Sequence, residues 1–267
     1  MAPLPGLVAF WDFQDDSLRS RGSAPVTLQA AGAPLDYAAE GVFGPRSLRF
    51  HAEGHLAANY LFAHAADVPS LNIGGPDAQV TVVAWIKREP SAYAGCQFIA
   101  GVWNEHHRRQ YGMFLNLHIW DSSEQVGAHI SGHGGPTPGH PYCMDVAIGA
   151  TPVPFNIWQC VAISYDGRHA RAYLDGLLDV REPQGTYGRN PFHYPEGLLK
   201  GDADFTVGAV ARPAKVTGDG QGGWIETGAL IANPFTGLLG GLAVFNRALD
   251  EAALRTLASP ARNNLLP

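Results

Sequence analysis

The sequence predicts a single all-β domain over residues 1–267, built as a two-sheet antiparallel sandwich with one short C-terminal helix. Alternation of apolar and polar residues, which is typical of half-buried strands, recurs along the chain, whereas helix-type spacing is nearly absent. Glycine (32 residues) and proline (20) are frequent although 46% of the residues are hydrophobic, which indicates short strands around a sizeable core. Two Asp-Gly pairs, 166–167 and 175–176, end apolar runs and predict tight type I′ hairpins.

The individual elements follow from the same patterns. Strands are predicted at 7–13, 47–50, 80–86, 98–103, 110–120, 125–133, 158–165, 171–174, 205–210 and 238–245. Their inward-facing residues should include Phe10, Phe50, Trp85, Leu115, Val161, Ile163 and Val244. A helix is predicted at 251–257, because Asp250 can cap its first turn and Leu254 and Leu257 share one side. The long connections 132–156, 182–203 and 211–236 either wall a groove over one sheet or merely decorate the surface.

Composition and charge narrow the class of protein. The formal net charge is -6 without a basic stripe, so no nucleic-acid partner is expected. No stretch reaches the roughly twenty apolar residues of a membrane span. The N-terminus lacks the pattern of a signal peptide, so the protein is expected to be cytoplasmic or a trimmed secreted protein. The compartment and the oligomeric state stay open. Three widely spaced cysteines, at 96, 143 and 160, predict no intramolecular disulfide.

Five segments resemble, in order, the strands of laminin-G-like modules: Gly6–Phe13, Ser47–Phe50, Val80–Lys87, Trp158–Gly176 and Leu242–Leu249. They span nearly the whole chain. On this resemblance the chain is identified as a laminin-G-like jelly-roll domain of the concanavalin-A-like lectin/glucanase superfamily. The superfamily includes lectins, glycan-binding modules, adhesion domains, glycoside hydrolases and polysaccharide lyases, so the resemblance predicts the fold and not one activity.

Two departures from the family pattern concern cofactor and chemistry. Many laminin-G-like modules carry an acidic residue in the closing strand that helps bind calcium, and residues 240–243 here contain none. Asp12 and Asp16, near Asp15, remain as possible ligands for a hard cation, so calcium (Ca²⁺) is a possible cofactor. The Glu-x-Asp-x-x-Glu strand of hydrolases with this fold does not occur.

Strand alternation places candidate binding residues on one face of two consecutive strands. In 110–120 the polar and aromatic face carries Gln110, Phe114, Asn116, His118 and Trp120, and in 125–133 it carries Gln125, His129, Ser131 and His133. A four-residue link at 121–124 suits a hairpin that would put His118 diagonally beside His129. Such a face either forms the floor of a sugar-binding groove or is an ordinary solvated sheet face.

Proteins hold sugars with planar hydrogen-bonding groups and an aromatic platform. The candidate hydrogen-bonding residues are Asn116, Gln110, His118 and His129, and the candidate platform is Trp103, Trp120 or Tyr142. The proline-rich loop 133–142 adds His133 and His140. The polar run 103–111 includes Arg109, which can clamp a carboxylate. A solvated hairpin loop would have the same composition.

Three functions fit these residues. The first is a carbohydrate-recognition protein with an oligo- or polysaccharide ligand. The second is a polysaccharide-degrading enzyme, most plausibly a lyase. In that chemistry Arg109 or an amide neutralises a uronate carboxylate, and His129, His118 or Tyr142 moves the protons. The third is a protein–protein adhesion module, which a large exposed apolar patch would favour.

Overall fold

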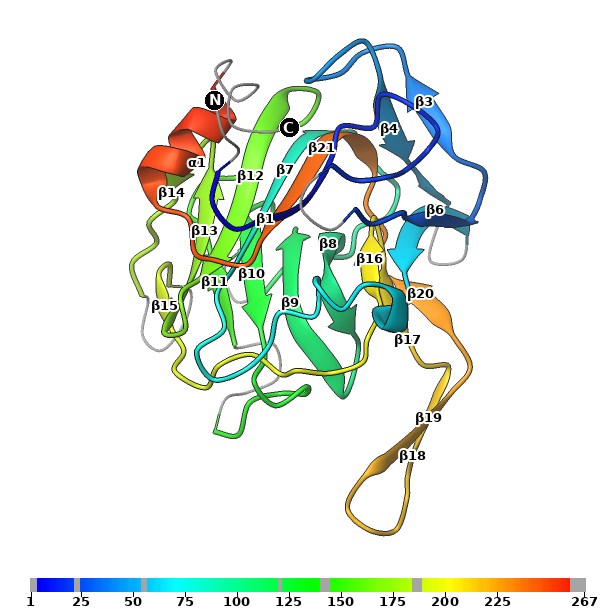
Figure 1. Cartoon of the computed structure of the whole chain (residues 1–267), viewed down its shortest axis with the longest axis vertical. Coiled ribbons are helices and arrows are strands. Elements are labelled where there is room, and N and C mark those ends of the chain that lie inside the picture. Colours follow the sequence, from blue (N-terminus) through cyan, green and yellow to red (C-terminus); the bar gives the residue numbers. More distant parts are fainter. Residues whose placement is uncertain are drawn as a thin grey trace.

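The chain folds into two stacked, mainly antiparallel sheets and one short α-helix in the computed structural model, which describes residues 4–21, 25–53, 57–119, 122–139, 145–183 and 189–259 (Figure 1). The first sheet comprises β14 (Leu177–Leu178), β13 (His169–Leu174), β12 (Trp158–Tyr165), β7 (Val80–Arg88), β21 (Gly237–Phe245), β4 (Ser47–Phe50) and β3 (Asp36–Ala38), in this spatial order, with β1 (Leu7–Trp11) beside β21 and β15 (Phe192–His193) beside β13. The predicted all-β sandwich is confirmed.

The second sheet carries the surfaces that matter for function. Its spatial order is β11 (Val146–Ile148), β10 (Val126–Ile130), β9 (Arg108–Leu115), β8 (Gln97–Asn104), β16 (Phe205–Val207), β6 (Ala57–Ala63) and β2 (Gln29–Gly32), with β5 (Ala52–Glu53) beside β6 and β17 (Val210–Arg212) between β8 and β20 (Leu230–Ala232). The remaining elements are the hairpin β18 (Lys215–Gly218)–β19 (Trp224–Thr227), a 3-10 turn at Ala65–Asp67 and α1 (Glu251–Ala258). No helix in the described ranges is long and apolar enough to cross a membrane.

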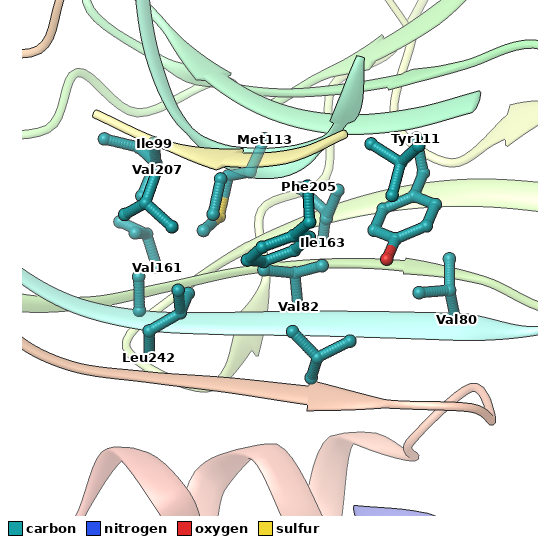
Figure 2. Packing of buried hydrophobic residues seen from close by; sticks show 14 of the residues in the cluster. Val80, Val82, Ile99, Tyr111, Met113, Val161, Ile163, Phe205, Val207 and Leu242 are labelled. Atoms are coloured by element: carbon teal, nitrogen blue, oxygen red, sulfur yellow. The ribbon is translucent and has the colours of Figure 1, made fainter. Parts of the chain in front are cut away.

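The main core lies between the two sheets. It includes the predicted inner residues Phe50, Leu115, Val161, Ile163 and Val244, all buried. Figure 2 shows how side chains from β16 and β9 meet those from β7, β12 and β21, with α1 on the far side of the first sheet. Burial of these apolar side chains is the main force that holds the sheets together.

The prediction that Phe10 and Trp85 also lie between the sheets is wrong. Both are buried on the opposite face of the first sheet, where Phe43 packs edge-on against each ring at 4.9 and 4.8 Å. Trp85 Nε1 donates a hydrogen bond to the carbonyl of Leu257 in α1 at 3.2 Å. Strand β7 is apolar on both faces because the helix covers its second face.

The C-terminal helix has the predicted cap. The Asp250 side chain accepts a hydrogen bond from the backbone N–H of Ala253 at 2.8 Å, and Leu254 and Leu257 are buried against the first sheet. We expect Asp250→Ala to lower the free energy of unfolding by about 1 kcal/mol, because a first-turn N–H loses its acceptor. Urea denaturation measures this. Asp250→Asn, which keeps the acceptor, serves as the control, and an equal loss in both variants would contradict the capping role.

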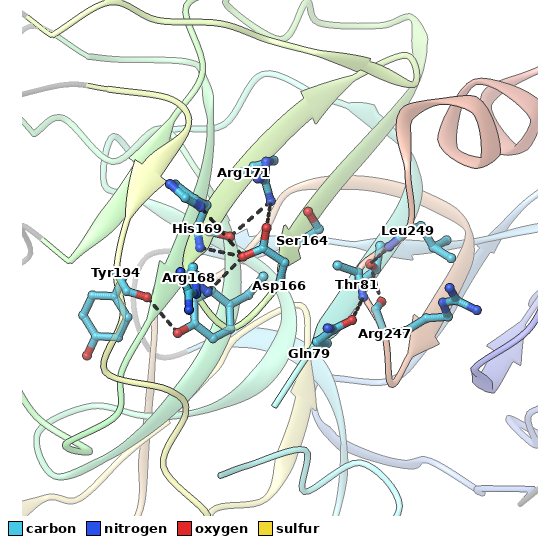
Figure 3. A network of polar contacts seen from close by, with 12 residues as sticks. Gln79, Thr81, Ser164, Asp166, Arg168, His169, Arg171, Tyr194, Arg247 and Leu249 are labelled. Carbon is cyan, nitrogen blue, oxygen red and sulfur yellow. Dashed lines mark hydrogen bonds and ion pairs between the residues drawn. The ribbon is translucent and has the colours of Figure 1, made fainter. Parts of the chain in front are cut away.

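The two Asp-Gly turns differ. At 175–176 both residues have positive φ (49° and 77°), as predicted for a type I′ turn. At 166–167 only Gly167 has positive φ, at 91°. There the Asp166 carboxylate accepts hydrogen bonds from the backbone N–H groups of Arg168 and His169 and from the Arg171 side chain (Figure 3). The side chain of Asp166 therefore stabilises this turn in place of the backbone geometry.

The connection 211–236 is not the irregular loop that the sequence predicts. It forms β17, β20 and the β18–β19 hairpin, which stands out from the body of the molecule (Figure 1). Two contacts hold the hairpin to β9 and the residues before it: Arg108 Nε donates to Glu226 at 2.9 Å, and the Trp224 ring stacks on His107 with centroids 4.4 Å apart.

The cysteines lie in different surroundings. Cys160 is buried in β12, Cys96 is half-buried just before β8, and Cys143 lies outside the described residues. The expectation that no intramolecular disulfide forms stays a prediction.

Candidate functional site

A cavity of about 260 Å³ lies on the outer face of the second sheet, the face turned away from the first sheet. Three of the predicted site residues, Trp103, Arg109 and His129, line it together. The remaining lining comes from β8, β9 and the β17–β20 pair and their flanks: Cys96, Glu105, His106, Phe114, Leu117, Arg212, Ala232 and Asn233. We call this cavity the His129 pocket.

A β-bulge places Arg109 in the pocket. Val102 pairs with Tyr111 and Trp103 pairs with Arg109, so Gln110 is an extra residue in β9 with no partner in β8. A bulge shifts the alternation of a strand by one residue. Arg109 therefore shares the outer face with Trp103, while simple alternation had predicted Gln110 there.

The guanidinium of Arg109 is held by a carboxylate. Arg109 is 1% exposed, and its Nη2 donates to Glu105 Oε2 at 2.9 Å. The other carboxylate oxygen, Oε1, accepts from Trp103 Nε1 at 3.3 Å and from Asn233 Nδ2 at 3.4 Å. The guanidinium carbon also lies 5.3 Å from the centre of the Trp103 ring. Glu105 thus positions the cation and the ring relative to each other.

His129 is buried at the back of the pocket. Its ring centroid lies 5.2 Å from that of Trp103 and 5.0 Å from that of Phe114. Its Nδ1 is 3.9 Å from the carboxylate of Asp145, a residue that is also buried. Burial lowers the pKa of His129 to about 4, and the nearby charge of Arg109 lowers it further, while Asp145 opposes the shift. The imidazole is therefore neutral at pH 7.

Glycine makes room for the aromatic part of the pocket. Phe98, Trp103 and Phe114 cluster with Val210 over Gly112, which pairs with His129 in the neighbouring strand. A Cβ at position 112 would lie 2.9 Å from ring atoms of Phe98 and Phe114. Any larger residue at 112 would push the rings off the sheet and change the shape of the pocket.

The prediction that His118 and His129 lie side by side on neighbouring strands is wrong. Strand β9 ends at Leu115 and the link to β10 runs over 116–125, not 121–124. Asn116 and His118 have positive φ (55° and 51°), which ends the strand alternation. His129 instead lies opposite Gly112, and His118 is exposed in the link.

Other predicted ligand-binding residues lie away from the lining. Gln110 Nε2 donates to Asn72 Oδ1 at 3.0 Å, and Asn116 Nδ2 donates to the carbonyl of Gly95 at 3.0 Å, so both hold neighbouring loops. The exposed His133 has Nε2 3.8 Å from Glu196. Trp120, His140 and Tyr142 lie outside the described residues.

The acidic residues proposed for calcium are each engaged by arginine. Asp12 pairs with Arg21 at 2.5 Å and Asp16 with Arg46 at 2.8 Å. Over the described ranges, no group of three or more His, Cys, Asp or Glu side chains gathers as a metal site would require. A cation at Asp12 and Asp16 would have to displace both arginines, and calcium binding there stays a prediction.

Glu105 and Arg212 line the pocket and Asp145 lies beside His129, and the sequence did not single out any of the three. Glu105 lies inside the polar run 103–111, so its position next to Arg109 was the available signal. Asp145 and Arg212 come from the long connections 132–156 and 211–236, and no pattern in the sequence predicts which of their residues return to the sheet.

The fold and the pocket together define a β-sandwich protein with a small polar and aromatic cavity on one outer sheet face. Residues 63–255, well over half of the chain, match the Laminin_G_3 family of the concanavalin A-like lectin/glucanases superfamily. The chain belongs to this family. No curated protein matches the sequence.

Solved structures share the fold at low identity. Domain 4 of AbnA, a GH43 extracellular arabinanase from Geobacillus stearothermophilus in complex with arabinotriose, is 16% identical with a TM-score of 0.59, covering 95% of this chain and 98% of that domain. Botulinum neurotoxin type C, whose cell entry depends on interaction with two ganglioside molecules, is 11% identical with a TM-score of 0.56, covering 98% of this chain and 52% of the other. Trypanosoma rangeli sialidase in complex with sialic acid is 14% identical with a TM-score of 0.54, covering 98% and 34%.

Proposed function

We propose that this protein recognises carbohydrate and binds an oligo- or polysaccharide at the His129 pocket. The observation that carries the proposal is the meeting of Trp103, Arg109 and His129 in one cavity on the outer sheet face. Such a site combines an aromatic surface with a few convergent polar groups, which is the usual composition of a small-ligand site. The glycan ligands of the arabinanase domain, the neurotoxin and the sialidase support the same class of ligand.

The chemistry of the pocket suits sugar hydroxyls. The neutral imidazole of His129 offers one hydrogen-bond donor and one acceptor. The ion pair of Arg109 with Glu105 adds a cationic donor and an anionic acceptor close together. Arg212 adds an exposed cation at the rim of the pocket. We therefore expect neutral and acidic sugars to compete for the same site, with Arg212 favouring the acidic ones.

The variant His129→Phe tests the pocket. Phenylalanine keeps the ring packed against Trp103 and Phe114 but removes both nitrogens. We expect glycan affinity to fall by about 1 kcal/mol, since a sugar hydroxyl loses its partner. Isothermal titration calorimetry on the best ligand from a panel of neutral and uronic-acid oligosaccharides measures this. His118→Phe, in the exposed link outside the pocket, is the matched control, and equal losses in both variants would place the ligand elsewhere.

A second candidate function is that of a polysaccharide lyase, which cleaves the chain by β-elimination. The meeting of His129, which is neutral at pH 7 and so able to accept a proton, with Arg109 and Arg212 in one pocket favours it. In such a reaction His129 takes the proton α to a uronate carboxylate, the glycosidic C–O bond breaks by elimination, and the leaving oxygen takes up a proton from the imidazolium or from water, so that one sugar end is left unsaturated. Arg109 or Arg212 would neutralise the carboxylate.

One experiment separates the candidate functions. The protein is incubated with neutral and uronic-acid polysaccharides while ultraviolet absorbance and reducing ends are followed together. Retention on the polysaccharide without products supports recognition alone, and absorbance from unsaturated ends supports lysis. New reducing ends without absorbance indicate hydrolysis and would contradict both candidates as stated.

A further inference from the structure

A second and larger cavity, of about 480 Å³, lies on the same outer face of the second sheet. Its lining includes Tyr60, Phe62 and His64 of β6 and its end, Thr206 of β16, and Asp204 just before β16. We call it the Tyr60 cavity. The β17–β20 pair separates it from the His129 pocket, since Ala211, Leu230 and Ile231 line the Tyr60 cavity while Arg212 and Ala232 line the other.

Strand alternation brings three rings to the cavity. Leu61 and Ala63 point into the core, so Tyr60, Phe62 and His64 point outward. The Tyr60 and Phe62 centroids are 6.1 Å apart, and those of Phe62 and His64 are 4.9 Å apart. The rings form a strip along β6 that is half-buried at Tyr60 and exposed at His64. The rings of Tyr60 and Phe62 are inclined to each other by 37°, and each offers apolar surface to the C–H face of a sugar ring.

Polar groups border the strip. Thr206 lies opposite Phe62 in the neighbouring strand, is 1% exposed, and has an Oγ1 atom without a hydrogen-bond partner in the described part of the chain. An unpaired buried hydroxyl is unfavourable, and a ligand hydroxyl would satisfy it. Asp204 accepts a hydrogen bond from the backbone N–H of Ala65 at 2.9 Å and lies 3.1 Å from His64 Nδ1, which fixes the imidazole at the edge of the cavity.

We propose that the Tyr60 cavity is a second glycan-binding site, which holds a neutral sugar ring against Tyr60 and Phe62 with a hydroxyl on Thr206. The ligand class rests on the proposed function, but the residues are independent of the His129 pocket. A neutral sugar is favoured because the described lining contains the carboxylate of Asp204 beside His64 and no lysine or arginine, so an acidic sugar would meet a carboxylate. The flat rings suit a sugar face better than a charged peptide.

The test uses arabinotriose and cellotriose as neutral probes with the whole chain. Saturation-transfer NMR detects binding, and titration calorimetry gives the affinity of wild type and variants. We expect Tyr60→Ala to weaken binding at this site about tenfold, and Tyr60→Phe, which keeps the ring, to leave it nearly unchanged. Thr206→Val keeps the shape and removes only the hydroxyl, so it should weaken binding roughly threefold to tenfold without loss of stability.

The outcomes distinguish the two sites. Binding that Tyr60→Ala weakens and His129→Phe does not supports the Tyr60 cavity, even if the His129 pocket binds nothing. Binding that only His129→Phe weakens overturns the second site and leaves the proposed function intact. Absence of saturation transfer with both probes also overturns it. If the dye 1-anilinonaphthalene-8-sulfonate binds and Tyr60→Ala abolishes that binding while neither sugar binds, the cavity takes an apolar partner and the proposal is wrong.

Discussion

Replacing Glu105 by leucine should lower the free energy of unfolding by about 3 kcal/mol, the lower end of the range seen when one member of a buried ion pair is removed, because Glu105 is itself 17% exposed. Arg109 is 1% exposed and would stay buried without the carboxylate that it now contacts at 2.9 Å. Trp103 Nε1 and Asn233 Nδ2 would lose the same acceptor. Urea denaturation at pH 7 measures the loss.

Two further variants show whether the ion pair is the cause. In the double variant Glu105→Leu/Arg109→Leu both charges are gone, so a large part of the loss should be recovered. Glu40→Leu removes the carboxylate of a surface pair with Lys87 at 3.0 Å and should cost at most about 1 kcal/mol. Strictly additive losses at 105 and 109 would mean that the two side chains contribute independently.

Acidification should destabilise the protein through His129. In the unfolded chain the imidazole takes up a proton near pH 6.5, whereas in the folded protein it does so only near pH 4. Between these values the unfolded state binds more protons, so the free energy of unfolding falls as the pH falls. The difference between the two pKa values corresponds to a loss on the order of 3 kcal/mol between pH 6.5 and pH 4.

The comparison with His129→Phe isolates this contribution, because phenylalanine keeps the packing and does not titrate. Unfolding free energies measured from pH 7.5 to pH 4 should fall about 3 kcal/mol further in wild type than in the variant. Parallel curves would show that His129 titrates in the folded protein as it does in the unfolded chain, so that burial does not hold the imidazole in its neutral form.

The strands that the sequence predicts well are the long central ones. Residues 80–86, 158–165 and 238–245 lie within β7, β12 and β21. They were predictable because a short run that is apolar on both faces is typical of a buried central strand. Strand β6 was missed, since Ala57–Ala63 is rich in alanine, a residue with low strand propensity. The alternation of Tyr60 and Phe62 was the signal that could have found it.

The candidate site was predicted only in part, for geometric reasons. The sequence placed Trp103, Arg109 and His129 on polar or aromatic faces and all three line the His129 pocket, yet their meeting depends on a bulge and on strand ends that alternation does not reveal. Gln110 and Asn116 were predicted on the outer face by simple alternation, which ignores the bulge at Gln110 and the end of β9 at Leu115. Asp145 approaches His129 from a connection whose path is set by packing, as with any contact between residues distant in sequence.

The extra residue at Gln110 also decides which side chain β9 presents to the pocket. Without the bulge Gln110 would pair with Trp103, and a strand shifted by one residue turns every side chain on one side of the change to the opposite face. The guanidinium of Arg109 would then point at the apolar core and the pocket would lose its cation. A deletion of Gln110 itself would instead restore simple pairing with Arg109 still opposite Trp103, so homologous chains that keep this pocket should carry either the bulge or a strand that is one residue shorter at this place.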